Sequence, residues 1–212
     1  MKRLLCGLLV LLVACKMGAG AEPAGYVEIH KSKPVEVNGL TFVAATEAQW
    51  PVRLGASKPV VIQLWITNSS DHDLIFRTFD TVWLKIKDDA GADVFSSYGR
   101  DGTMASPSVL IHAGDTYCLA LKPTLAWPKN PTLHPDNLRI DSKDKLRGVS
   151  FTDGTGAYFF FELPKAGAYE LAFEIRSSEE KAELEAKKLK GQTVWSGKTA
   201  TENASFEIIE VP

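Results

Sequence analysis

Hydrophobic and polar residues alternate along most of the chain from Tyr26 onward, with a period of two rather than 3.6. The alternation is clearest over residues 60–67, 82–87, 169–176 and 205–208. Successive side chains of a β-strand point to opposite faces of the sheet, so this pattern indicates strands with one buried and one wet face. Such strands are typical of antiparallel sheets. The pattern therefore predicts an all-β fold.

Turn-forming residues separate the predicted strands. Residues 68–71 follow the first clear strand, and residues 88–91 join 82–87 to the next apolar pair as a hairpin. Glycine, asparagine and aspartate adopt the backbone angles that tight turns need. Seven or more short strands separated by such turns indicate a sandwich or barrel, and we expect an antiparallel β-sandwich.

Two segments depart from the alternation. Residues 122–148 are polar and contain four prolines, so they are predicted to form a long loop. Residues 178–190 are predicted to form one short surface helix near the C-terminus. Ser177 and Glu180 have the spacing of a capping box, and Gly191 is placed to end the helix.

Residues 1–21 have the three parts of a secretory signal peptide: a basic start, an apolar run over 4–14 and small residues before a cleavage site. The apolar run is shorter than the roughly 20 residues that span a bilayer. We therefore expect an exported protein whose mature part, residues 22–212, is a single β-sandwich domain.

Cys15 offers a second cleavage site. The sequence Leu-Val-Ala-Cys at 12–15 resembles the lipobox of bacterial lipoproteins, in which the cysteine becomes the first mature residue and carries lipid. Lipid on Cys15 would hold the protein to the cell envelope without a spanning helix. Cleavage after Ala21 would instead leave a free periplasmic or extracellular protein, and both alternatives stay open. Either way Cys118 has no partner for an intrachain disulfide, and we expect it to be a small buried residue.

Several segments resemble immunoglobulin-like domains. Residues 167–171, Gly-Ala-Tyr-Glu-Leu, resemble the Gly-x-Tyr corner that opens a late strand, in which the hydroxyl, here of Tyr169, bonds back to nearby backbone. Residues 195–208 are similar to the closing strands of uncharacterised secreted bacterial sandwich proteins. Residues 64–71 and 82–91 resemble domains of the intracellular proteinase inhibitor type. These resemblances imply an immunoglobulin-like sandwich and identify no site residues.

Composition and motifs argue against several functions. The net charge is −2 and no basic patch is present, which argues against a nucleic-acid partner. The sequence contains no nucleophile elbow, zinc-protease motif, Cys-x-x-Cys or P-loop. Residues 71–73, Asp-His-Asp, and the aspartates of 88–93 are interpreted as solvated turns rather than metal sites. We expect a non-enzymatic protein with no cofactor and no metal, and an enzyme or metal module assembled from distant residues is a further hypothesis.

Two segments are candidates for binding. Trp127 is a large aromatic residue in a proline-stiffened loop, where it could anchor a partner or fold back as a lid over the sandwich. Tyr98 and Arg100 belong to a second candidate loop, 96–102. We expect a binding or structural protein of the cell envelope, whose partner is a protein or a cell-surface polymer and whose membrane contact is only through an N-terminal lipid. The inhibitor resemblance implies an alternative, a protease inhibitor acting through a sandwich loop.

Overall fold

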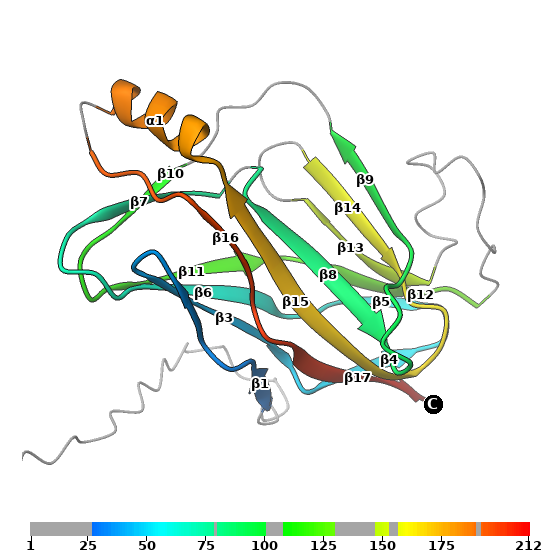
Figure 1. The fold of residues 1–212 in the computed structure, drawn as a ribbon. Helices are drawn as coiled ribbons and strands as arrows, with labels where there is room; N and C mark the ends of the chain where they lie inside the picture. Colours follow the sequence, from blue (N-terminus) through cyan, green and yellow to red (C-terminus); the bar gives the residue numbers. More distant parts are fainter. Residues whose placement is uncertain (1–26, 79, 101–107, 130–146, 153–156, 190–191) are drawn as a thin grey trace, which may run out of the picture.

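The fold is all-β, as the alternation predicts, and carries a helix near the C-terminus (Figure 1). The computed structural model describes residues 27–78, 80–100, 108–129, 147–152, 157–189 and 192–212. The predicted signal peptide and Cys15 lie outside these ranges. Within the ranges, no helix is long and apolar enough to cross a membrane.

The strands form four sheets, named here A to D. Sheet A has the order β1 (Ile29–Lys31), β3 (Leu40–Glu47), β6 (Ile62–Asn68), β11 (Thr116–Leu121), and β2 (Val35–Val37) also pairs with β3. Sheet B has the order β16 (Gly197–Ala200), β15 (Gly167–Ser177), β17 (Ala204–Val211), β4 (Gln49–Arg53), and β8 (Val82–Asp88) pairs with β15. Sheet C has the order β5 (Ala56–Pro59), β12 (Thr124–Trp127), β13 (Gly148–Thr152), β14 (Ala157–Glu162), β9 (Ser96–Arg100). Sheet D pairs β10 (Ser108–Ile111) with β7 (Leu74–Arg77).

Sheets A and B pack against each other over the main hydrophobic core. Residues of β6 alternate between buried and half-buried, as the pattern over 60–67 predicts. Phe42 of β3 lies edge-on to Trp195 with ring centroids 5.4 Å apart. In β4, Trp50 stacks on Phe206 of β17 at 3.9 Å. Buried apolar side chains of sheets A, B and C belong to one contiguous cluster, so the three sheets share a core.

One strand pair departs from the predicted antiparallel pattern. β4 runs parallel to β17, from Gln49 opposite Glu207 to Arg53 opposite Val211. The chain enters β4 directly from β3 at Ala48, whose carbonyl accepts from the backbone N–H of Glu207 at 2.9 Å. The antiparallel prediction is therefore wrong for this pair, because alternation of side chains does not record strand direction.

The helix α1 (Glu179–Lys188) lies within the predicted range 178–190, but its cap differs from the prediction. The Oγ of Ser178, not of Ser177, accepts from the backbone N–H of Lys181 at 3.2 Å. Ser177 is instead the last residue of β15. The predicted cap is one residue too early because Ser177 still belongs to strand β15, so the helix cap is the next residue, Ser178. Gly191 lies outside the described residues.

The predicted loop 122–148 contains a strand. Residues 124–127 form β12, which pairs with β5 on one side and with β13 on the other, while residues 130–146 lie outside the described ranges. The burial predicted for Cys118 is also wrong, since its side chain is exposed. β11 is an edge strand, and the more buried neighbours of Cys118 on either side, Tyr117 and Leu119, pack against the core.

The hairpin predicted at residues 88–91 is present and leads to sheet C. The backbone N–H of Asp88 donates to the carbonyl of Ala92 at 3.0 Å, and that of Val94 donates to the carbonyl of Ile86 at 3.0 Å. Beyond Val94 the chain no longer pairs with β8 and continues as β9, which pairs with β14. The two arms of this hairpin therefore belong to different sheets.

Candidate functional site

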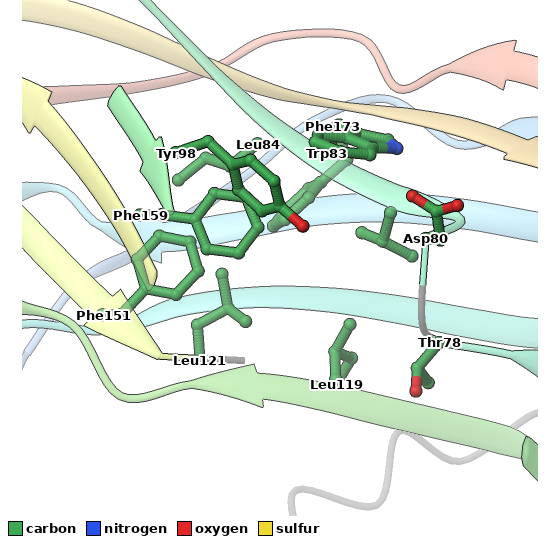
Figure 2. Close-up of a pocket in the computed structure, with 11 residues that line it drawn as sticks. Thr78, Asp80, Trp83, Leu84, Tyr98, Leu119, Leu121, Phe151, Phe159 and Phe173 are labelled. Atoms are coloured by element: carbon green, nitrogen blue, oxygen red, sulfur yellow. The ribbon is translucent and has the colours of Figure 1, made fainter. Parts of the chain in front are cut away.

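An apolar cavity of about 40 Å³ lies where the edges of three sheets meet (Figure 2). β8 is the edge strand of sheet B at this point, β9 that of sheet C and β11 that of sheet A. The lining residues are Thr78, Asp80, Val82, Trp83, Leu84, Tyr98, Leu119, Leu121, Phe151, Phe159 and Phe173. Because these edges do not pair with one another beside the cavity, the shared core is open to the surface here.

Aromatic rings form one wall of the cavity. The ring of Tyr98 lies 5.4 Å from that of Trp83 and 5.1 Å from that of Phe159, which stacks in turn on Phe151 at 4.9 Å. Tyr98 is 44% exposed, so its ring is shared between the cavity and solvent. Figure 2 shows the leucines of β11 pointing toward these rings from the opposite side. The wall thus presents a partly exposed aromatic surface.

Trp83 connects the cavity with the outer face of sheet B. The guanidinium of Arg176 lies 5.1 Å from the centroid of its indole ring, within the range of a cation–π contact. The indole Nε1 is buried and makes no hydrogen bond to any residue that the structure describes. Buried donors are normally paired, and an indole N–H can only donate.

The size and chemistry of the cavity favour an apolar side chain over a metabolite. Pockets for small molecules usually measure about 300–1,000 Å³, far more than the 40 Å³ found here. Asp80 is the one carboxylate in the lining, and its Oδ2 accepts from the ammonium of Lys181 at 3.0 Å. The lining contains no histidine, cysteine or lysine to form an acid–base pair with it.

A second hollow, of about 140 Å³, continues the cavity between β8 and β9. It shares Trp83, Leu84, Tyr98 and Phe159 with the cavity and adds these residues: Lys85, Ser96, Ser97, Phe161, Glu174 and Arg176. Its added side chains are mainly polar or charged. The two hollows together form a groove with an apolar inner end and a polar outer end, which we call the β8–β9 groove.

Two larger hollows have a different character. One, of about 590 Å³, lies between the start of α1 and β16 and includes Arg176, Lys181 and Lys198 together with Asp80 and Glu179. The other, of about 410 Å³, lies beside β4 and is lined by residues of both charges. Both are more open to solvent than the apolar cavity. Their mixed charges identify no class of ligand.

Trp127, the first predicted binding residue, lies in the core rather than on an exposed loop. Its side chain is 0% exposed, and its Nε1 donates to a carboxylate oxygen of Glu210 at 2.9 Å. The guanidinium of Arg147 lies 4.8 Å from its ring centroid. The ring points inward, as expected if Trp127 folds back over the sandwich. However, Trp127 belongs to strand β12 and not to a loop. A fully buried ring offers no surface to a partner, so Trp127 contributes to the core and not to a binding surface.

Tyr98 and Arg100, the second candidate pair, lie on strand β9 rather than in a loop. Tyr98 reaches the β8–β9 groove. The side chain of Arg100 lies outside the described part of the structure, as do residues 101–107. Of the predicted residues, Tyr98 is thus the one that the structure places at a hollow.

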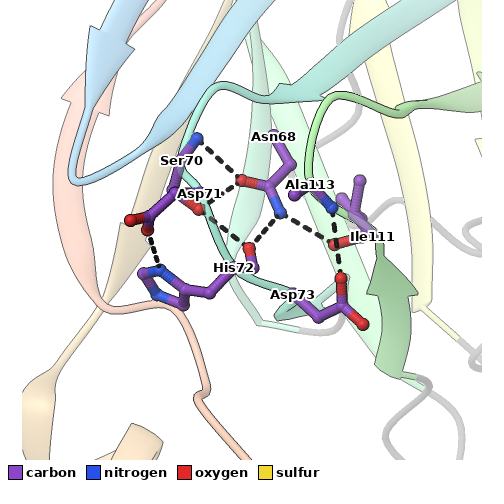
Figure 3. Close-up of polar contacts among 7 residues, drawn as sticks. All are labelled: Asn68, Ser70, Asp71, His72, Asp73, Ile111 and Ala113. Carbon is purple, nitrogen blue, oxygen red and sulfur yellow. Dashed lines mark hydrogen bonds and ion pairs between the residues drawn. The ribbon is translucent and has the colours of Figure 1, made fainter.

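The segment 71–73 is an exposed turn held by hydrogen bonds, as interpreted from the sequence (Figure 3). Buried Asn68 donates from its amide to the carbonyls of His72 and Ile111, at 2.8 and 2.9 Å. The imidazole of His112 lies 2.8 Å from a carboxylate oxygen of Asp73, and this hydrogen bond raises the pKa of His112 and lowers that of Asp73. Among the described residues, no group of three or more ligating side chains could hold a metal ion.

The groove contains residues that sequence reasoning passed over. Trp83 lies at a wet-face position in the alternation of 82–87, beside Lys85. A tryptophan on the predicted solvent face of a strand indicates a surface that contacts another segment or a partner. This pattern could have identified residues 82–87 as a candidate binding strand. The contributions of Leu119 and Phe159 depend on strands that meet only in the folded chain, and no local signal marks them.

Comparison with known proteins adds no family to this geometry. No protein-family model matches the chain, and no curated protein matches it.

Proposed function

We propose that this chain is an exported, non-enzymatic binding protein of the cell envelope. Its partner is a protein that places an apolar side chain in the β8–β9 groove. The observation that carries the proposal is the opening of the core between three sheet edges, lined by the partly exposed Tyr98 and by Trp83. Aromatic residues around a small apolar hole are frequent anchors of protein interfaces.

The lining favours a protein over a cell-surface polymer. A polysaccharide needs polar partners for its many hydroxyl groups, whereas most of the side chains that line the inner end of the groove are apolar or aromatic. The single carboxylate there, Asp80, is already paired with Lys181, which supports a binding role rather than catalysis. Export is supported by the signal-peptide pattern of residues 1–21.

We also propose that the fold is an immunoglobulin-like sandwich. The hydroxyl of Tyr169 donates to the carbonyl of Lys165 at 2.8 Å, which is the bond expected of a tyrosine corner. The packing of sheet A against sheet B supports the same proposal.

Site-specific photo-crosslinking in the native host tests the function. A photoreactive amino acid replaces Tyr98 in one variant and Leu184, which is 53% exposed on α1, in a control variant. We expect a protein that crosslinks from position 98 and not from position 184. That protein is then purified, and its affinity for the mature chain is measured by calorimetry.

The affinity should fall at least tenfold, about 1.4 kcal/mol, in the variant Tyr98→Ala. Leu184→Ala should leave it within about twofold of the parent value. Equal crosslinking from both positions, or an affinity unchanged by Tyr98→Ala, would refute the proposal. If the crosslinked protein is a protease that the chain inhibits one-to-one, the protein is a protease inhibitor, as in the alternative hypothesis. A crosslinked polysaccharide would overturn the proposal of a protein partner.

A further inference from the structure

We propose that the partner enters the β8–β9 groove as an extended segment and adds to the free edge of β9 as a new β-strand. This inference rests on the proposed function and specifies how the partner is recognised. Three observations carry it: the direction of the free backbone groups of β9, the divergence of the two hairpin arms, and the position of the cavity beside them.

The pairing of β9 with β14 determines which backbone groups face the groove. The backbone N–H of Glu162 donates to the carbonyl of Phe95, directly opposite, at 2.9 Å. In an antiparallel ladder, hydrogen-bonded and non-hydrogen-bonded pairs alternate. The pairs of Ser97 and Gly99 are therefore hydrogen-bonded to β14, while the N–H and C=O groups of Ser96 and Tyr98 point away from it. Those groups form no backbone hydrogen bond with any described residue.

β8 forms the opposite wall by the same geometry. The backbone N–H of Arg176 in β15 donates to the carbonyl of Thr81 at 2.9 Å, and the carbonyl of Ile86 is bonded on the other side, to Val94. The backbone of Leu84, two residues before Ile86, therefore also faces away from β15. The hairpin arms pair near the turn and then diverge, so unpaired groups of both arms face a widening gap.

An extended polypeptide matches this gap better than other ligands. It supplies N–H and C=O groups at the spacing that Ser96 and Tyr98 require, as in strand addition to an open sheet edge. Alternate side chains of an added strand point to opposite faces. On one face they would reach the apolar cavity beside Trp83 and Tyr98, and on the other they would point outward.

Along residues 96–99, the edge of β9 carries neither a charged side chain nor a proline, which are two features that usually protect an edge strand. Natural edges are often protected by lysine, proline or a bulge. The other edge of sheet C, β5, carries Lys58 and ends at Pro59, and β8 carries Lys85 and Lys87. Residues 96–100 contain neither lysine nor proline, and a Cβ added at Gly99 would meet no atom within 4 Å. The open space at Gly99 lies above one face of the strand, so no side chain at this position crowds the groove.

β11 is the other edge at the cavity without lysine or proline, and it supplies a matched control. The backbone N–H of Asn68 donates to the carbonyl of Asp115 at 2.9 Å, so the backbone of Ala120 points away from its partner strand β6. Proline is tolerated where an edge N–H faces away from the sheet. Ser96→Pro and Ala120→Pro are therefore comparable perturbations on two different edges.

The experiment uses linear twelve-residue peptides displayed on phage and selected on the purified mature chain. Peptides that also bind the variant Tyr98→Ala are discarded. For a selected peptide, each backbone amide is N-methylated in turn, and the dissociation constant is measured by fluorescence anisotropy. We expect tenfold or greater losses at alternate amides only. Ser96→Pro should weaken binding at least tenfold, while Ser96→Ala and Ala120→Pro should change it less than twofold.

The outcomes separate the two proposals. If peptides depend on Tyr98 but the N-methyl scan shows no alternation, strand addition is wrong and the groove remains a binding site. A loss with Ala120→Pro rather than Ser96→Pro would also overturn pairing with β9. If no Tyr98-dependent peptide is selected, both proposals fail. The N-methyl scan leaves the protein unaltered, so its result does not depend on how well a proline variant folds.

Discussion

Replacing Trp127 with alanine should destabilise the protein strongly. The side chain is 0% exposed and belongs to the core shared by the three sheets. Truncating a buried tryptophan to alanine typically costs about 3–5 kcal/mol, because burial is lost and a void remains. For a domain of this size, 1 kcal/mol lowers Tm by roughly 2–4 °C, so Tm should fall by roughly 6–20 °C. Trp127→Phe keeps a ring but removes the hydrogen bond to Glu210, and should cost about 1–2 kcal/mol in addition to any packing defect.

Thermal unfolding followed by near-ultraviolet circular dichroism measures this effect. Tyr98→Ala is the matched control, because its ring is also aromatic but 44% exposed, and its Tm should fall far less than that of Trp127→Ala. A Tm of Trp127→Ala within about 2 °C of the parent value would refute the core position of Trp127. It would favour the exposed, partner-binding position, which is one of the two alternatives that the sequence leaves open for this residue.

Two further predictions concern hydrogen bonds at turns. Tyr169→Phe leaves the carbonyl of Lys165 without its donor and should lower the free energy of unfolding in urea by about 1 kcal/mol. The hydroxyl of Tyr117 makes no hydrogen bond to a described residue, so Tyr117→Phe should change the free energy of unfolding little. Equal losses of unfolding free energy in the two variants would contradict the tyrosine corner. The imidazole of His112 should titrate above its ordinary pKa of 6.5 by NMR, and Asp73→Asn should lower that pKa toward the ordinary value. Because the pKa of His112 is raised in the folded protein, its contact stabilises the fold below pH 6.5; because the pKa of Asp73 is lowered, its contact stabilises the fold above pH 3.8. The pair therefore contributes most to stability between these two pH values. An imidazole pKa at the ordinary value in the parent protein would contradict the contact.

Local patterns in the sequence were sufficient for the class of fold and for several of its elements. Alternation over 82–87 and 169–176 predicts β8 and β15, because a strand exposes its period of two within a few residues. The hairpin at 88–91 follows from turn chemistry that is equally local. The helix over 178–190 was predicted from its flanking signals, although the cap is Ser178. The backbone bond of Tyr169 was expected from a five-residue motif.

The candidate site was only partly predictable. Tyr98 was a candidate from the sequence as part of the segment 96–102, but that segment was expected to be a loop. Whether residues 96–100 form a strand depends on β14, which lies far along the chain. The burial of Trp127 likewise depends on β12 finding partners in β5 and β13. Proline-rich surroundings suggest a loop, and these distant pairings override that local preference.

The sequence by itself therefore determined the all-β class, the positions of strands such as β6, β8, β15 and β17, the hairpin and the helix, since each is encoded by residues that are neighbours along the chain. The tertiary structure alone decided the parallel pairing of β4 with β17 and the opening of the core between β8, β9 and β11. The physical reason is that an edge or an opening is defined by which strands do not pair. That property belongs to contacts between distant segments, and no window of the sequence contains it.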